Sequence, residues 1–219
     1  MGYNIFMKSI KNEAVAHCPN HCEDFDVEYW SLISADKDPD LKDAALGGEL
    51  NLVQCPECGT FFHHDGDFIY FDAPAELLIF VFSEKNRPQE KELLTRMQQD
   101  YNIIKNTLFK QLHMDYSPLS VFGLEALKNI LQEEENYSFE SEAVAACSAA
   151  EGFGVVRLKP SYAREHHFPY YVPAPKGNIT ANEYAVAASK VLKTGLKSPL
   201  LVNFKDRMSQ EGASLPLTL

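Results

Sequence analysis

The chain has 219 residues, 45% of them hydrophobic and 23% charged, which suffices for one large or two small domains. Its longest apolar run, Leu77–Phe82, is far shorter than the ~20 residues of a membrane span, and its first residues lack a signal-peptide pattern. We therefore expect a cytoplasmic protein without a membrane segment. Residues 1–135 carry 11 Lys and Arg against 24 Asp and Glu, and this negative charge argues against a nucleic-acid partner.

Short strands and tight turns dominate the first 82 residues. Phe25–Tyr29 alternates apolar and acidic side chains, which is the period-two pattern of a half-buried strand. Asp38-Pro39 predicts the start of a short helix over residues 40–46, and Gly47-Gly48 predicts its end. The expected strands are residues 3–7, 13–17, 25–29, 50–53, 61–64, 68–71 and 77–82, of which the last three are antiparallel.

Four cysteines form two pairs near the ends of these strands: Cys18 with Cys22, and Cys55 with Cys58. Two thiol pairs separated by one intervening module are typical of a tetrahedral zinc site. Gly59 follows the second pair and can adopt a left-handed conformation, which lets backbone N–H groups point at the sulfurs. We therefore predict that these four cysteines bind Zn²⁺.

The first pair leaves a second ligand set open. Three residues separate Cys18 from Cys22, and His21 stands where the second ligand of a two-residue spacing would lie. The ligands could thus include His21 in place of Cys22. We favour four thiolates, because a free thiol beside a zinc site is prone to oxidation. Disulfides are disfavoured without a secretory signal, and a redox pair is disfavoured because Cys55 does not open a βαβ unit.

A long helix is predicted over residues 90–113, and a second helix over residues 119–134. Apolar residues of the long helix recur at intervals of three or four, which places them on one helical stripe. We interpret this stripe as a face that packs on the core. The alternative is a homodimer interface, which the length of the helix relative to the sheet favours. The stripe consists of Leu93, Met97, Tyr101, Ile104, Leu108 and Leu112.

The acidic run at residues 133–136 predicts a solvated helix end and a domain boundary, so the expected domains are 1–135 and 136–219. Thr180 and Glu183 form a capping box at the start of a helix that should end near Gly195. The other expected elements are a helix over 141–150, a strand over 154–158, an irregular aromatic segment over 160–177 and a strand over 200–202. The predicted fold class is α+β: a zinc-ribbon-like antiparallel β domain with C-terminal helices, followed by a smaller α+β extension.

Five segments within residues 10–135 are similar to those of a known family: Cys18-Pro19, Gly48–Asn51, Cys55–Gly59, Ile69–Asp72 and Val121–Leu127. On these segments the chain resembles the CpXC domain, a bacterial family named for its paired Cys-Pro-X-Cys motifs. The resemblance implies zinc ligands at Cys18, Cys55 and Cys58, and it transfers no catalytic residue because the family has no established activity. The chain departs from the family pattern at the first pair, where His21 replaces the expected cysteine and Cys22 comes one residue late.

Two further clusters carry residue types that can do chemistry. His63 and His64 are consecutive on a predicted strand and point to opposite faces, so they cannot chelate one ion together. The segment Arg164–His167, with Tyr162, Tyr170 and Tyr171 nearby, offers groups for acid–base work near neutral pH. We interpret it first as an aromatic loop packed on the sheet or facing a partner.

The leading functional hypothesis is an interaction or assembly module of the bacterial cytoplasm in which zinc is structural. A protein partner or a homodimer would contact the long helix or the 160–177 segment. One alternative is a metal-dependent enzyme with an open zinc position and His21, His63 or Glu57 as the base. Another is a thiol- or metal-sensing switch in which Cys22 or His21 is spare.

Overall fold

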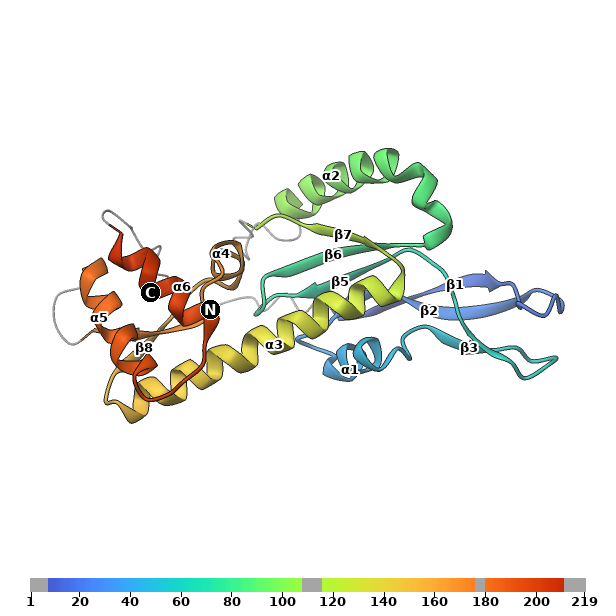
Figure 1. Cartoon of the computed structure of the whole chain (residues 1–219). Helices are drawn as coiled ribbons and strands as arrows, with labels where there is room; N and C mark the ends of the chain where they lie inside the picture. The colour runs from blue at the N-terminus through green and yellow to red at the C-terminus, as the bar shows by residue number, and fades with distance from the viewer. Residues whose placement is uncertain (1–7, 108–115, 176–179, 211–219) are drawn as a thin grey trace, which may run out of the picture. The chain divides into compact units, whose positions relative to one another are not determined.

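The computed structural model describes residues 8–107, 116–175 and 180–210, which form two compact units, Met1–Leu131 (unit 1) and Gln132–Leu219 (unit 2) (Figure 1). The fold is α+β, as the sequence predicts. The strands are β1 (Ile10–Ala16), β2 (Phe25–Ser34), β3 (Leu52–Gln54), β4 (Phe61–His63), β5 (Phe68–Asp72), β6 (Leu77–Phe82), β7 (Leu119–Phe122), β8 (Gly154–Arg157) and β9 (Tyr171–Ala174). The helices are α1 (Pro39–Gly47), the 3₁₀ turn η1 (Glu84–Gln89), α2 (Glu90–Thr107), α3 (Gly123–Ala150), α4 (Pro160–His166), α5 (Ala181–Leu192) and α6 (Pro199–Ser209).

Unit 1 is built on a five-stranded sheet in the order β1-β2-β5-β6-β7. The sheet is mixed, because β2 pairs with β5 and β6 pairs with β7 in parallel, whereas β1/β2 and β5/β6 are antiparallel. Strands β3 and β4 form a separate two-stranded antiparallel ribbon. The antiparallel pairing expected for residues 61–82 therefore holds within β5/β6, whereas β4 pairs with β3 instead.

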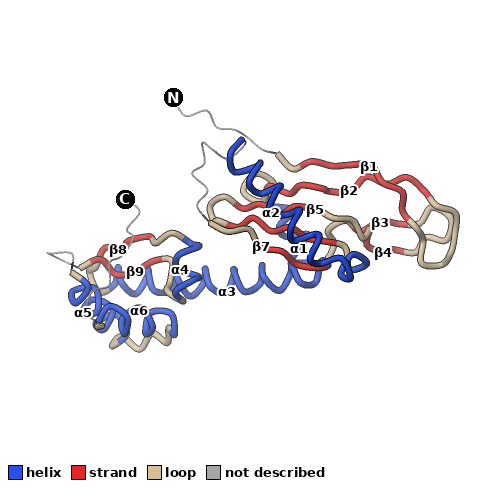
Figure 2. Tube along the Cα trace, turned by 90° about the horizontal axis from the view of Figure 1, so that it is seen from above, coloured by secondary structure: helices blue, strands red, loops and turns tan. Residues whose placement is uncertain are grey.

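Both faces of this sheet are covered, which explains why β6 is an uninterrupted run of six buried apolar residues. Alternate side chains of β5 and β6 enter opposite apolar clusters, one completed by α1 and the start of α3, the other by α2. Figure 2 shows these helices against the sheet in a second view. The first cluster includes Ile33, Ala45, Tyr70, Ile79, Val81, Leu127 and Leu131, and the second includes Phe71, Leu78, Phe80, Phe82, Tyr101 and Phe122.

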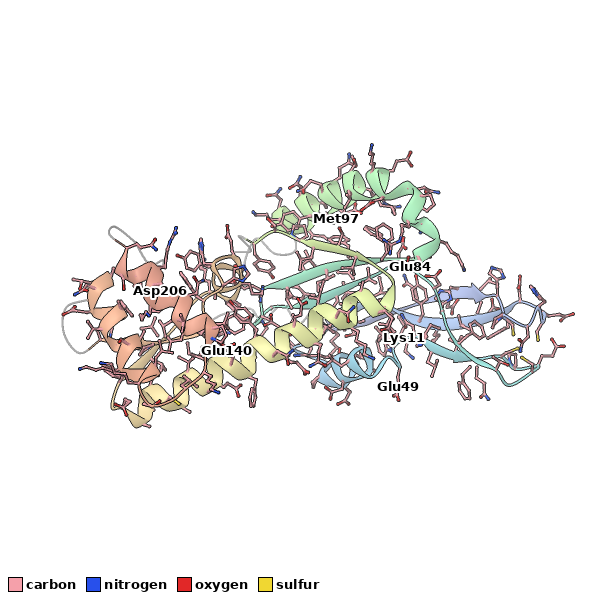
Figure 3. The ribbon with its side chains drawn as sticks, viewed as in Figure 1. Lys11, Glu49, Glu84, Met97, Glu140 and Asp206 are labelled. Atoms are coloured by element: carbon pink, nitrogen blue, oxygen red, sulfur yellow. The ribbon has the colours of Figure 1, made fainter. Side chains whose placement is uncertain are left out.

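The apolar stripe of α2 packs against its own sheet. Leu93, Met97 and Ile104 border the cluster that contains the buried Tyr101 (Figure 3 labels Met97). Leu108 and Leu112, the other two stripe residues, lie outside the described part of the chain, as does the end of the predicted helix. The core interpretation is thus confirmed for the four described residues. A partner on this helix stays a prediction, and it would meet the outer face, where the Ile103 residue is 61% exposed.

Among the described residues of unit 2, one apolar cluster receives side chains from α3, α5, α6 and the β8–β9 ribbon. The capping box at Thr180 and Glu183 is confirmed: the hydroxyl accepts from the Glu183 N–H at 3.3 Å, and the carboxylate accepts from the Thr180 N–H. The Glu140 carboxylate, which is distant in sequence, caps the start of α6 by accepting a hydrogen bond from the Leu200 N–H at 2.9 Å. The cluster includes Val144, Leu158, Phe168, Val172, Tyr184, Val191, Leu201 and Phe204.

Several sequence predictions about the second half of the chain are wrong. Residues 119–122 form β7 rather than a helix, and α3 then runs without a break through the acidic segment 133–136. That segment is no solvated end, because Glu134 is buried and paired with Arg164. Residues 160–177 contain α4 and β9 instead of irregular chain, and residues 200–202 are helical because the Ser198 hydroxyl caps α6 by accepting from Leu201 N–H.

The predicted strand over residues 3–7 falls outside the described residues. Within the described ranges, no helix is both long enough and apolar enough to cross a membrane.

Candidate metal centre

The four paired cysteines come from two turns of unit 1. Cys18 and Cys22 lie in the loop between β1 and β2, and Cys55 and Cys58 lie in the turn between β3 and β4. Figures 1 and 2 show both turns at the same end of unit 1. The site therefore depends on how each turn folds and on what holds the small β3–β4 ribbon against the sheet.

The residues before β3 hold this ribbon in place, and they include the Gly48–Asn51 segment of the resemblance. Gly48 ends α1 in a left-handed conformation (φ 74°), and Leu50 is buried in the cluster beneath the sheet. The Asn51 side chain accepts from the Trp30 N–H at 2.7 Å and donates to the Trp30 carbonyl at 3.1 Å. The Asn51 side-chain amide thus pairs with both backbone polar groups of Trp30 in β2, and it fixes where the chain enters β3.

The β3–β4 turn presents the second cysteine pair. The Cys55 N–H donates to the Thr60 carbonyl at 2.9 Å, and the Cys55 carbonyl accepts from the Gly59 N–H at 2.9 Å. Gly59 has φ 74°, a conformation that costs a residue with a Cβ about 1 kcal/mol or more. The glycine lets the chain reverse immediately after Cys58, so that both sulfurs lie on one side of the turn.

The first pair uses a different turn with a similar result. The Cys18 carbonyl accepts from the His21 N–H at 3.0 Å, and His21 itself has φ 59°. Each turn thus contains one left-handed residue, but Gly59 follows the second cysteine of its pair, whereas His21 precedes Cys22. Because the reversal takes place at His21, the next residue, Cys22, is the one directed toward the other thiols, which accounts for the irregular spacing.

The structure brings all four sulfurs together. The Sγ atoms of Cys18, Cys22, Cys55 and Cys58 lie within 4.8 Å of one another, and the Cys18 and Cys58 sulfurs are 3.6 Å apart. In a tetrahedral zinc site with Zn–S bonds of about 2.3 Å, the sulfurs are about 3.8 Å apart. All five cysteines of the chain are free thiols. The spacing thus fits one metal ion among four thiolates.

The four thiols differ in exposure and hydrogen bonding. Cys18 and Cys55 are buried, Cys22 is intermediate and Cys58 is exposed. Desolvation raises the pKa of both Cys18 and Cys22 above the ordinary value. Hydrogen bonds from the Thr60 side chain and backbone, followed by one from Asn20, lower the pKa of Cys58 to about 5.

Asn20 and Thr60 were not predicted as part of the site. The Asn20 Nδ2 lies 3.5 Å from Cys58 Sγ and donates to Thr60 Oγ1 at 2.8 Å, and its backbone N–H donates to Cys18 Sγ at 3.4 Å. Thr60 Oγ1 is 3.3 Å from Cys58 Sγ. Asn20 thus links the two turns. Amide and hydroxyl donors near thiolates are common in metal sites. The sequence signal for Asn20 and Thr60 was therefore their position, each two residues after a cysteine.

The other candidate groups lie outside the thiol cluster. Among the described residues, the group of potential metal ligands contains the four cysteines and neither His21 nor His63. The His63 Nδ1 lies 3.2 Å from the Leu50 carbonyl oxygen, and the Glu57 carboxylate accepts from the Glu23 N–H at 3.3 Å. His64 stacks against Tyr29 with ring centroids 4.6 Å apart, and partial burial lowers the pKa of His64.

The Arg164–His167 segment belongs to a packed network in unit 2. Arg164 Nη1 donates to Glu134 at 3.0 Å and to the Tyr170 hydroxyl at 3.0 Å, and that hydroxyl also lies 2.7 Å from the Glu134 carboxylate. Burial raises the pKa of Tyr170. His166 packs edge-on against Tyr162. Arg164, Glu134 and Tyr170 hydrogen-bond one another, as expected for a structural network rather than for acid–base groups directed into a cavity.

The comparisons with known proteins agree with the resemblance seen in the sequence. A family model described as CpXC protein matches residues 16–137, which is more than half of the chain and includes all four clustered cysteines. No curated protein and no solved structure matched.

Proposed function

The chain belongs to the CpXC family, and we propose that its four clustered cysteines bind one structural zinc ion in a protein-interaction module of the bacterial cytoplasm. The observation that carries this proposal is the mutual approach of the four sulfurs within 4.8 Å. Four thiolates select soft metals, and zinc is the commonest ion in a mononuclear site of this kind.

Closure of the site favours a structural role. A catalytic zinc normally keeps one position for water or substrate, whereas four thiolates complete a tetrahedron. Two of these cysteines are buried, and the sulfur of the exposed residue, Cys58, is flanked by Asn20 and Thr60. No histidine or carboxylate belongs to the ligand group within the described residues, so the set supports a closed site rather than a hydrolytic one.

The metal would stabilise the β3–β4 ribbon, a small element of unit 1 that is separate from the five-stranded sheet. The β3–β4 ribbon has three residues per strand, and a two-stranded ribbon of this size is barely stable in water. Asn51 anchors one end of the ribbon, and the thiols join the other end to the loop after β1. A structural zinc typically contributes about 10–16 kcal/mol of apparent binding free energy, enough to fix both turns.

The outer face of the ribbon supports the interaction role. Phe61 and Leu52 lie on the exposed face of the paired strands and are 62% and 42% exposed. An exposed aromatic and an exposed aliphatic residue on a short ribbon suit a contact with another protein. In this proposal the metal sets the position of the ribbon, and the ribbon presents Phe61 to the partner.

Metal content of the purified full-length protein and two variants tests the ligand set. We expect one zinc per chain in the parent protein and in His21→Ala, and a loss of at least about 100-fold in zinc affinity for Cys22→Ser. Zinc loss in His21→Ala with retention in Cys22→Ser would contradict the four-thiolate set. Absence of stoichiometric metal from the parent, after reconstitution with zinc under reducing conditions, would contradict the function as a whole.

A further inference from the structure

We propose that Cys58 is the reactive corner of the metal centre and the site at which soft electrophiles modify the protein. The inference rests on the proposed four-thiolate site and adds a chemical difference among its ligands. Two features of the structure carry it: the exposure of each cysteine residue and the hydrogen bonds to Cys58.

Exposure distinguishes Cys58 from the other three ligands. Cys18 and Cys55 are 5% and 1% exposed, so an electrophile cannot approach their sulfurs without opening the turns. Cys22 is partly covered, whereas Cys58 is exposed. Because substitution at carbon requires the sulfur to approach the reacting carbon directly, access alone ranks Cys58 first.

Asn20 and Thr60 moderate this reactivity. The Asn20 amide donates to Thr60 Oγ1 at 2.8 Å, and Thr60 Oγ1 lies 3.3 Å from Cys58 Sγ. A thiolate has no proton to donate, so in the metal-bound form the Thr60 hydroxyl is the donor in this contact. The Asn20 amide also lies 3.5 Å from the same sulfur. Hydrogen bonds to a metal-bound thiolate withdraw electron density from sulfur, and a bound thiolate carries no proton, so they act here by lowering nucleophilicity.

The covalent step needs only the thiolate and an alkylating reagent. The Cys58 sulfur forms a bond to the electrophilic carbon of iodoacetamide, the carbon–iodine bond breaks, and iodide leaves with the electron pair. The product is a neutral thioether, a much weaker metal ligand than a thiolate. Modification at Cys58 should therefore release the metal. Exposure to electrophiles would in this way free the two cysteine turns that the metal holds together.

The test is limited alkylation of the zinc-loaded full chain with iodoacetamide, with peptide mass spectrometry for the site and a chromophoric chelator for released zinc. We expect Cys58 to carry the first label and zinc to be released at the same rate. Cys147, which lies on α3 outside the cluster, serves as an internal thiol reference. First labelling of Cys22, or uniform labelling of all four ligands, would overturn the inference.

Two variants test the role of the hydrogen bonds, and a third is the matched control. Asn20→Ala and Thr60→Val should each speed alkylation of Cys58 by about fivefold, the effect of losing one ordinary hydrogen bond. Gln54→Ala is the control, since its amide donates to the Gly59 carbonyl at 3.2 Å rather than to a sulfur. Equal rates in all four proteins would refute the moderating role.

Zinc content measured on the same samples separates the two proposals. If the parent protein binds one zinc and Cys58 is not labelled first, this inference fails while the metal centre stands. If the parent binds no zinc, the metal centre fails and the inference fails with it.

Discussion

The two units use polar and ionisable groups in opposite ways. In unit 1 the apolar clusters lie on the two faces of the sheet, and the cysteines sit in turns beyond the strand ends, outside those clusters. In unit 2 the ion pair between Glu134 and Arg164 is partly buried beside the apolar cluster and bonds Tyr170, a member of it. Loss of a metal centre outside the apolar clusters should leave their packing intact. Loss of a hydrogen-bonded network that includes a core residue should disturb the packing of that core.

The largest effect is expected from the loss of a metal ligand. Cys55→Ser should remove stoichiometric zinc, and with it about 10 kcal/mol of binding free energy that fixes the two turns. Amide hydrogen exchange should then lose protection in residues 17–24 and 52–63. Protection of β5, β6 and the whole of unit 2 should persist. Global loss of protection in Cys55→Ser would show that the core depends on the metal.

The second effect lies in the core of unit 2. Phe204 is fully buried and packs edge-on against Phe168 and Tyr184, so Phe204→Ala should cost about 3–5 kcal/mol of the stability of this unit. The only tryptophan, Trp30, lies on β2 and reports unit 1. Its fluorescence midpoint in urea should stay unchanged while exchange protection in α5 and α6 falls. A matching drop in the Trp30 transition would contradict the independence of the two cores.

The third effect probes the ion pair. Arg164→Met leaves the Glu134 carboxylate, 8% exposed, with Tyr170 as its remaining described hydrogen-bond donor. Breaking one side of a buried pair costs about 3 kcal/mol, which should lower the unfolding free energy of unit 2. Tyr170→Phe is the milder companion, at about 1 kcal/mol, because it removes one hydroxyl. If Arg164→Met is neutral by exchange and calorimetry, the network contributes little to stability.

The fourth effect is the pH dependence of metal binding. The raised pKa of Cys18 and Cys22 keeps both thiols protonated near neutral pH, whereas the pKa of about 5 leaves Cys58 deprotonated. Binding must therefore displace at least two protons, so apparent affinity should fall by a factor of about 100 or more per pH unit on going from pH 8 to pH 6. Competition with a chromophoric chelator measures the slope. A slope of one proton or fewer would contradict these assignments.

Local sequence signals predicted unit 1 better than unit 2. Three signals in unit 1 each have a single local cause, and the structure has the corresponding elements. They are the alternation in Phe25–Tyr29, the apolar run in Leu77–Phe82 and the glycine pair at the end of α1. Helix α6 was mistaken for a strand because Leu200–Val202 is too short a run to show its period. The acidic run at 133–136 was read as solvated, since its partner Arg164 is distant in sequence and no local pattern reveals the pair.

The same contrast holds for the candidate site. The grouping of the cysteines in two pairs pointed to the four thiols, although only the second pair has the Cys-Pro-X-Cys spacing, and the structure places those four together. The roles of His21, Asn20 and Thr60 depend on backbone conformation and on contacts between two turns, which spacing does not encode. His21 in particular was considered as a ligand because of its position, while its left-handed φ of 59° makes it the residue that turns the chain toward Cys22.

The most direct test of the four-thiolate centre is zinc-edge X-ray absorption on the purified full-length chain. We predict four sulfur scatterers at about 2.3 Å and no nitrogen or oxygen in the first coordination shell. Three sulfurs with one nitrogen or oxygen at about 2.0 Å would contradict the closed site, and would favour either His21 as a ligand or a position open to water.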